Sequence, residues 1–206
     1  MTELGADRTI VCIGGVGGSP SEWDEVTPLL SRLARVVTTI PARGPLVLIG
    51  HSEGGVAALR IAAGQSGRVV DAVVLASGFF PPARAGRSLT AAVVDYGRHR
   101  LLYLRDLAAR GRRPSPSRRG VGQMASLARL GLRPAAFHRL AGAVLCPVLV
   151  IHGGQDHVVP IAFARAAVAA HPGWTFRQLR GAGHNPHRDE PAAWATAVAE
   201  WLGTVL

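Results

Sequence analysis

The sequence predicts an α/β fold in which a mostly parallel sheet carries helices on both faces. Short apolar runs at 9–13, 36–40, 46–49, 69–77, 147–151 and 176–179 are typical of buried strands. Helix-like stretches separate most of these runs, as the crossovers of a parallel sheet require. At 206 residues, the chain is long enough to form one domain with its own core.

The first expected strand, 9–13, ends in the glycine-rich loop 14–18. Ser19 then precedes Pro20 and Glu22, a pattern that starts helices. We expect this helix to reach about Leu33. Its predicted inward face consists of Trp23, Val26, Leu29, Leu30 and Leu33.

Further helices are expected at 56–63, at 159–170 and at the amphipathic stretch 191–205. In a parallel sheet, functional groups gather at the carboxyl ends of the strands. The loops after Ile13, Ile49 and Ile151 are therefore the places to search for chemistry.

The connection between the expected strands 36–40 and 46–49 is too short for a normal crossover. Only residues 41–45 join them, and five residues reach at most about 18 Å. Either 36–40 is not a regular parallel strand, or one face of the sheet lacks a helix and the strand count is reduced.

The positive charge is concentrated in one segment. All 23 basic residues are arginines, and the formal net charge is +10. Residues 81–145 hold 13 arginines against two acids, Asp95 and Asp106, which gives +11, so the rest of the chain is close to neutral. No recognised nucleic-acid motif or interleaved aromatic pattern accompanies this charge, so we expect no nucleic-acid partner.

Two cysteines, Cys12 and Cys146, are too few for a disulfide framework or a cysteine-based zinc site. No apolar run approaches the roughly 18 residues of a membrane span, and the first residues do not resemble a secretory signal. We therefore expect a cytoplasmic protein without a membrane span, and the oligomeric state stays open.

The segment Gly50-His51-Ser52-Glu53-Gly54 lies between an expected buried strand and an expected helix. A G-x-S-x-G sequence in that context is a nucleophile elbow, a tight turn that exposes the serine hydroxyl. Ser52 is therefore placed to attack a carbonyl carbon if a histidine and an acid approach it.

Four motifs together resemble the α/β-hydrolase family. They are the loop 14–19 followed by Trp23, the elbow at Ser52, the run from Cys146 to Asp156 that contains His152-Gly-Gly-Gln-Asp156, and Gly181-Ala-Gly-His184 before a terminal helix. The resemblance implies Ser52 as nucleophile, His184 as general base and Asp156 as the acid that orients the histidine. No metal and no organic cofactor are required.

The same resemblance implies an oxyanion hole made by the backbone N–H groups of Glu53 and Val16. It also implies a division into a core at 1–80 and 146–206 and a helical cap at 81–145. The residues of this segment themselves indicate helical pieces near 88–109 and 123–130. Where the family often has His-Gly at the first loop, this chain has Gly14.

Several residues compete for these roles. Asp71 and Asp106 are rivals for the acid, and His187 is a rival for the base, although a solvated position is the simpler interpretation of His187. For His51, His152 and His157 we expect structural roles rather than a metal site. We expect Glu22 and Glu53 to be solvent or rim carboxylates, and the substrate-pocket candidates are Gly15, Trp23, Phe79 and Phe80.

These observations predict a serine hydrolase that cleaves a carboxylic ester or thioester through an acyl-enzyme. The substrate would be a small acyl compound, and a cap of charge +11 would favour an anionic one. Two alternatives stay open: a non-catalytic relative that binds a small ligand in the same pocket, and an acyltransferase that uses the same three residues.

Overall fold

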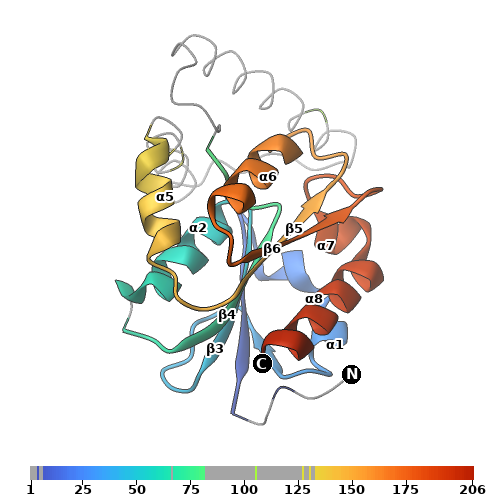
Figure 1. Ribbon diagram of the computed structural model, residues 1–206. Helices are drawn as coiled ribbons and strands as arrows, with labels where there is room; N and C mark the ends of the chain where they lie inside the picture. The colour runs from blue at the N-terminus through green and yellow to red at the C-terminus, as the bar shows by residue number, and fades with distance from the viewer. Residues whose placement is uncertain are drawn as a thin grey trace.

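The computed structural model describes residues 7–65, 67–81 and 133–206, together with Leu4, Arg105, Leu127 and Leu130. Six parallel strands form one sheet in the order β2-β1-β3-β4-β5-β6 (Figure 1). The strands are β1 Thr9–Ile13, β2 Arg35–Val37, β3 Leu46–His51, β4 Val70–Ala76, β5 Val148–Gly153 and β6 Trp174–Leu179. The predicted α/β class with a parallel sheet is confirmed.

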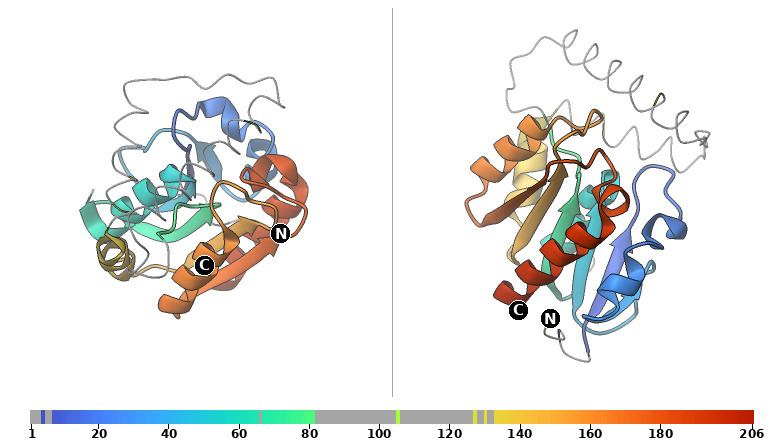
Figure 2. Two further views of the ribbon diagram at one scale, coloured as in Figure 1. Left: turned by 90° about the horizontal axis from the view of Figure 1, so that it is seen from above. Right: turned by 90° about the vertical axis from the view of Figure 1, so that its right-hand side faces the viewer.

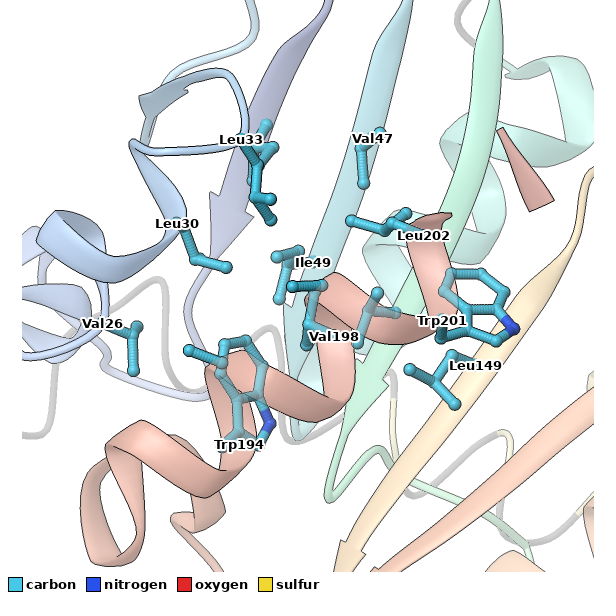
Figure 3. Packing of buried hydrophobic residues seen from close by; sticks show 14 of the residues in the cluster. Val26, Leu30, Leu33, Val47, Ile49, Leu149, Trp194, Val198, Trp201 and Leu202 are labelled. Carbon is cyan, nitrogen blue, oxygen red and sulfur yellow. The ribbon is translucent and has the colours of Figure 1, made fainter. Parts of the chain in front are cut away.

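One face of the sheet is covered by the short helices η1 Pro20–Trp23 and α1 Thr27–Leu30 and by the long helix α8 Pro191–Val205. Helix α8 lies across the strands in the right-hand view of Figure 2. Trp194 and Val198 of α8 pack against Leu30 and the strand residue Ile49 (Figure 3). This face therefore holds one of the two apolar clusters of the core.

The other face carries helices α2 Glu53–Arg60, α5 Pro134–Gly142 and α6 Ile161–Ala170, with the helical turn η2 Ile61–Gln65 after α2. The strands point alternate residues to the two faces, so Leu48 belongs to this second cluster while its neighbours Val47 and Ile49 belong to the first. Such double-sided burial explains why the strands read as continuous apolar runs.

The prediction of one continuous helix from Ser19 to Leu33 is wrong. The structure has η1, then turns, and then the four-residue helix α1, with Pro28 in its first turn. Proline lacks an N–H and collides with the carbonyl four residues earlier, so a helix must restart at Pro28 rather than run through it. The inward face is correct in outline, since Trp23, Val26, Leu30 and Leu33 are buried.

The short connection before β3 is explained by the length of β2, which ends at Val37 instead of Ile40. Val37 is level with Val11, and Leu46 is level with Thr9, on opposite sides of β1. The chain must move about 10 Å sideways and about 7 Å back. The eight residues 38–45 can do this without a helix, so β2 is a regular but very short parallel strand.

Most of the arginine-rich segment lies outside the described residues, and with it the expected helical pieces near 88–109 and 123–130. Helix α5 falls at the end of this segment and was not expected. Its Phe137 and Ala141 are buried in the second core cluster, beside Phe80. The division into a core and a cap at 81–145 stays a prediction.

No helix in the described part of the chain has both the length and the apolar composition that a membrane span needs. Both cysteines have free thiols; Cys12 is buried in β1, and Cys146 is half-buried just before β5.

Candidate active site

Ser52 stands between the end of β3 and the start of α2, in a backbone conformation that is rare for residues other than glycine. Its φ is 53° and its ψ is −118°. A Cβ at position 50 would overlap the carbonyl of Gly54, and one at position 54 would overlap the carbonyl of Ile13. The glycines of the motif therefore permit the tight turn that exposes Ser52.

The structure brings Ser52, His184 and Asp156 together from three different loops. The Nε2 atom of His184 is 3.2 Å from Oγ of Ser52, and its Nδ1 atom is 3.0 Å from Oδ2 of Asp156. A carboxylate only accepts hydrogen bonds, so Nδ1 donates to it and Nε2 is left to accept from the serine hydroxyl. The three residues form one continuous hydrogen-bonded chain.

Asp156 is buried and fully engaged by donors. Its Oδ1 accepts from the backbone N–H groups of Val158, at 2.8 Å, and Val159, at 2.9 Å. Its Oδ2 lies 3.2 Å from Nε2 of His152, in addition to the contact with His184. Burial alone would raise the pKa of Asp156, but His184, His152 and the backbone donor of Val159 lower it to about 2. Asp156 is therefore a carboxylate over the whole range of ordinary pH.

His152 has two hydrogen-bonding neighbours on the same atom. Its Nε2 is 2.8 Å from the carbonyl of Val159 as well as close to Asp156, so this nitrogen carries the proton that both oxygens share. Burial lowers the pKa of His152 and keeps the ring neutral. The structural role expected for His152 is thus to hold the loop that carries Asp156.

The first loop approaches the serine closely at Gly15. A Cβ at that position would be 3.1 Å from Cβ of Ser52 and 3.3 Å from Nδ1 of His51. Val16 follows directly, and Glu53 begins α2 on the other side of Ser52. Gly15 and Ser52 are thus the residues at which the first loop approaches the elbow. Val16 and Glu53, the residues expected to supply the oxyanion donors, each come next in the sequence after one of them.

A second group of polar residues is buried beside these three. Oε1 of Glu22 is in direct contact with Nδ1 of His51, and Nε2 of His51 is 2.9 Å from the backbone carbonyl of His184. Nε2 of His187 lies 3.7 Å from Oε1 of Glu22, and the His187 ring stacks on Trp23 with centroids 4.4 Å apart. In the described part of the chain, Glu22, His51 and His187 are the group whose potential metal-ligating atoms gather within 4.8 Å.

These positions correct three expectations. Glu22 is not a rim carboxylate, since its side chain is only 10% exposed. Glu53 is also buried, and His187 is fully buried rather than solvated. His187 cannot replace His184 as the base, because it is His184 that contacts Ser52.

Of the other predicted residues, Asp71 lies far along the sheet at the start of β4 and pairs with Arg8 at 2.6 Å. Asp106 is outside the described residues. Trp23 belongs to the first core cluster and Phe80 to the second, where Phe80 packs against Phe137. Phe79 is partly buried, and its backbone N–H donates to the carbonyl of Ser52 at 3.1 Å.

Sequence reasoning missed the cluster of Glu22, His51 and His187 as a unit. Two of its members stand beside motifs that were recognised, since His51 precedes Ser52 and His187 follows His184 by three residues. Glu22 carried a weaker signal, since it is one of three acids, with Asp24 and Glu25, that follow a loop with four glycines. Their convergence depends on the packing of η1 against α7 Pro186–Asp189, which no local pattern reports.

Comparison with known sequences identifies the family of this chain. A family model described as "Alpha/beta hydrolase family" matches residues 12–197. An uncharacterized protein of Mycobacterium tuberculosis is 38% identical over 58 residues, which is 28% of this chain and only 17% of that protein's length.

Two solved structures have the same fold. An esterase from Thermogutta terrifontis matches with a TM-score of 0.69 at 20% identity, covering 99% of this chain and 92% of that one. An esterase from Exiguobacterium antarcticum matches with a TM-score of 0.66 at 17% identity, covering 97% and 93%. The chain therefore belongs to the alpha/beta hydrolase family.

Proposed function

We propose that the protein is a serine hydrolase that cleaves a carboxylic ester or thioester through a covalent acyl-enzyme. The observation that carries this proposal is the hydrogen-bonded chain from Oγ of Ser52 through His184 to Asp156. An alcohol is a weak nucleophile at neutral pH and needs a base within hydrogen-bond reach. Nε2 of His184 stands at that distance and on the correct side of the ring.

In the proposed reaction, Oγ of Ser52 forms a bond to the carbonyl carbon of the substrate while its proton moves to Nε2 of His184. The carbonyl oxygen becomes an oxyanion. Collapse of this intermediate breaks the bond to the leaving alcohol or thiol, which takes the proton from Nε2. A water molecule then repeats the sequence on the acyl-enzyme and releases the carboxylic acid.

Asp156 stabilises this cycle in two ways. Its contact with Nδ1 holds the imidazole in the tautomer that leaves Nε2 free to accept a proton. Its lowered pKa keeps it ionised, so it offsets the positive charge that His184 gains during the reaction. The four donors around its two oxygens keep it from rotating away from His184.

The backbone N–H groups of Val16 and Glu53 are the proposed donors to the oxyanion. One such donor stabilises a transition state by about 3–4 kcal/mol in comparable enzymes. The proposal is supported by the position of Gly15, which brings the first loop against Ser52, and by Glu53 opening helix α2 directly after the serine.

The proposed substrate class is an acyl compound that carries negative charge. This rests on the sequence of residues 81–145, with 13 arginines and two acids, since a field of one sign raises the local concentration of the opposite charge. The esterases named above have the same fold, which supports an ester as the bond that is cleaved.

A fluorophosphonate probe tests the proposed function directly. The probe forms a stable bond only to an activated serine, so we expect mass spectrometry to find it on Ser52 in the folded protein. Ser52→Ala should lose both the label and all hydrolysis of p-nitrophenyl esters. Ser77→Ala is the control, because Ser77 also has a positive φ, at 43°, but is fully buried and is not proposed to react. An unlabelled wild-type protein would refute the proposal.

A further inference from the structure

The buried pair formed by Glu22 and His51 connects three loops at the site. Glu22 lies in η1 and accepts a hydrogen bond from the backbone N–H of Gly15 in the first loop. Its Oε1 is in direct contact with Nδ1 of His51, at the end of β3. Nε2 of His51 donates to the backbone carbonyl of His184 at 2.9 Å. Through these contacts, the Glu22–His51 pair connects the glycine-rich first loop, the elbow at Ser52 and the loop that carries His184.

The surroundings of this pair favour the charged form of both members. Burial alone would raise the pKa of Glu22, but the charge and hydrogen bond of His51, followed by the Gly15 donor, lower it. Burial would likewise lower the pKa of His51, yet its contacts with Glu22 and with the His184 carbonyl raise it. A charge pair formed in a buried place has a well-defined geometry, because separating the partners would leave each one unpaired.

His187 does not compete for the charge of Glu22. Burial and then the charges of His51 and Arg188 hold the pKa of His187 well below its usual value, so its ring is neutral. The other titratable groups around the pair are Cys12 on β1, whose pKa is raised to about 12 by burial and by Glu22, and the site residues His184 and Asp156. The balancing cation for Glu22 is therefore His51.

The first loop is shaped to receive the Glu22 carboxylate. A Cβ at position 14 would lie 2.6 Å from Oε2 of Glu22, and one at position 18 would overlap the same atom. Gly14 does not have a positive φ, so its backbone conformation alone does not demand glycine. A side chain at position 14 would therefore have to displace the Glu22 carboxylate from its contact with His51.

We propose that Glu22 is a positioning residue for the serine chemistry: paired with His51, it fixes the first loop and the His184 loop around Ser52. Glu22 does not touch the reacting atoms. It acts through the Gly15 N–H, which precedes the proposed oxyanion donor Val16, and through His51, which holds the main chain of His184. This inference rests on the proposed function of Ser52.

A metal ion in the same cluster is the alternative that the contacts disfavour. Two ligands of one ion each lie about 2.0–2.2 Å from the metal and on different sides of it. Oε1 of Glu22 and Nδ1 of His51 instead touch each other, which leaves no room for an ion between them.

The test compares Glu22→Gln with Glu25→Gln, since the Glu25 side chain is 50% exposed and lies three residues along the chain. Glutamine keeps the shape of Glu22 but removes its charge. We expect kcat on a p-nitrophenyl ester to fall by up to roughly 100-fold with little change in KM, as a small misplacement of reacting groups does. Glu25→Gln should match the wild type. A wild-type kcat in Glu22→Gln, or a loss confined to KM, would overturn the inference.

The pH profile separates positioning from a general loss of packing. The raised pKa of His51 keeps the ring charged above pH 6.5, the ordinary pKa of a histidine, so activity should persist there and fall only as His51 loses its proton. In Glu22→Gln the alkaline fall should move to lower pH, because the carboxylate that raised the pKa is gone. An alkaline limb that is identical in both proteins would contradict the inference.

Gly14→Ala gives a second, independent measurement. In the wild-type background the new methyl group meets the Glu22 carboxylate, so the melting temperature and kcat should both fall. In the Glu22→Ala background that obstacle is absent, and Gly14→Ala should cause no further loss. If Gly14→Ala is equally harmful in both backgrounds, Glu22 does not fill the space of the loop and the inference fails.

A metal role of the cluster and a failure of the proposed function would each give a different result from those above. Loss of activity in EDTA that Zn²⁺ restores would assign the cluster to a metal and overturn positioning. If the wild type itself neither labels with fluorophosphonate nor turns over esters, the proposed function fails.

The ion pair can in that case still be measured through stability. Its contribution should be fully present between pH 4.5 and pH 6.5, the ordinary pKa values of a glutamate and a histidine. It should be lost as pH falls through the lowered pKa of Glu22, and again as pH rises through the raised pKa of His51. A pH-independent difference in the free energy of unfolding between wild type and Glu22→Gln would overturn the pair.

Discussion

The hydrogen-bonded arrangement of Ser52, His184 and Asp156 depends on one backbone conformation that most residues avoid. Ser52 has a positive φ, and it retains that conformation because the glycines on either side let β3 and α2 meet in a tight turn. Such strain persists only where the surrounding structure enforces it. Here β4 contributes, because the N–H of Ser52 donates to the carbonyl of Ala76 at 3.1 Å.

At the same scale, Asp156→Asn tests whether the buried carboxylate is the orienting acid. The amide keeps an oxygen for the N–H groups of Val158 and Val159 but removes the charge that holds Nδ1 of His184. By comparison with the serine proteases, we expect kcat to fall by about 10⁴ while the circular dichroism spectrum stays unchanged. Steady-state kinetics on p-nitrophenyl esters make the measurement.

Asp71→Asn is the matched control for that substitution. Asp71 was the rival acid within the described residues, and it pairs with Arg8 at the start of β4, away from Ser52. Its loss should leave kcat at the wild-type level. Normal turnover in Asp156→Asn would remove Asp156 from the proposed mechanism.

At the scale of the elements, the strands were predictable and the breaks between helices were less so. The four strands β1, β3, β4 and β5 followed from apolar runs, because they are mostly buried between the helices on the two faces of the sheet. The edge strands β2 and β6 are only partly buried, and the apolar runs placed both of them with different bounds. The region 19–33 contains a good start signal and an apolar face, yet Pro28 divides it into η1 and α1. One continuous helix and two short helices would show the same spacing of apolar residues, so this spacing alone does not locate the break.

Helix α8 contributes the largest side chains to the first core cluster. Trp194 has no exposed surface, and its ring lies 6.4 Å from that of Trp23 and 6.0 Å from that of His187. It belongs to the same apolar cluster as the strand residue Ile49 (Figure 3). We expect Trp194→Ala to lower the free energy of unfolding by about 3–5 kcal/mol, because it leaves a large cavity. Urea denaturation followed by circular dichroism provides the value.

Two further substitutions on α8 make that measurement specific. Glu200→Ala changes an exposed residue of the same helix and should alter stability by no more than about 0.5 kcal/mol. Trp194→Phe should fall between the two, since it removes less volume. A Trp194→Ala variant as stable as the wild type would mean that α8 is not a principal part of the core.

At the scale of the whole molecule, the positive charge belongs to one stretch of sequence and should influence encounter rather than chemistry. We expect kcat/KM for an anionic coenzyme A thioester to fall as salt is raised from low to physiological concentration, because screening shortens the range of the field. The rate on a neutral p-nitrophenyl ester is the control and should change little. Equal salt dependence for both substrates would contradict steering by the arginines.

The sequence alone predicted which serine, acid and histidine come together, but it did not predict the buried polar residues around them. The serine, the acid and the histidine were found because each follows a recognisable motif, and the structure places all three within hydrogen-bond distance. The burial of Glu22 could not be predicted, because it depends on His51 as a charge partner and on the room left by glycines at 14 and 18. The contact with His51 joins residues 29 positions apart, which is beyond the reach of any local pattern.

The asymmetry between the two rims of the sheet has a practical consequence. Ser52, Asp156 and His184 all follow the carboxyl ends of strands, whereas residues 42–45 and the loop 67–69 lie together at the amino ends of β3 and β4. A solid support or a fluorophore attached at residues 42–45 would leave the rim with Ser52 facing the bulk solution. This end of the sheet is therefore suited to oriented immobilisation, because it lies away from the proposed reacting groups.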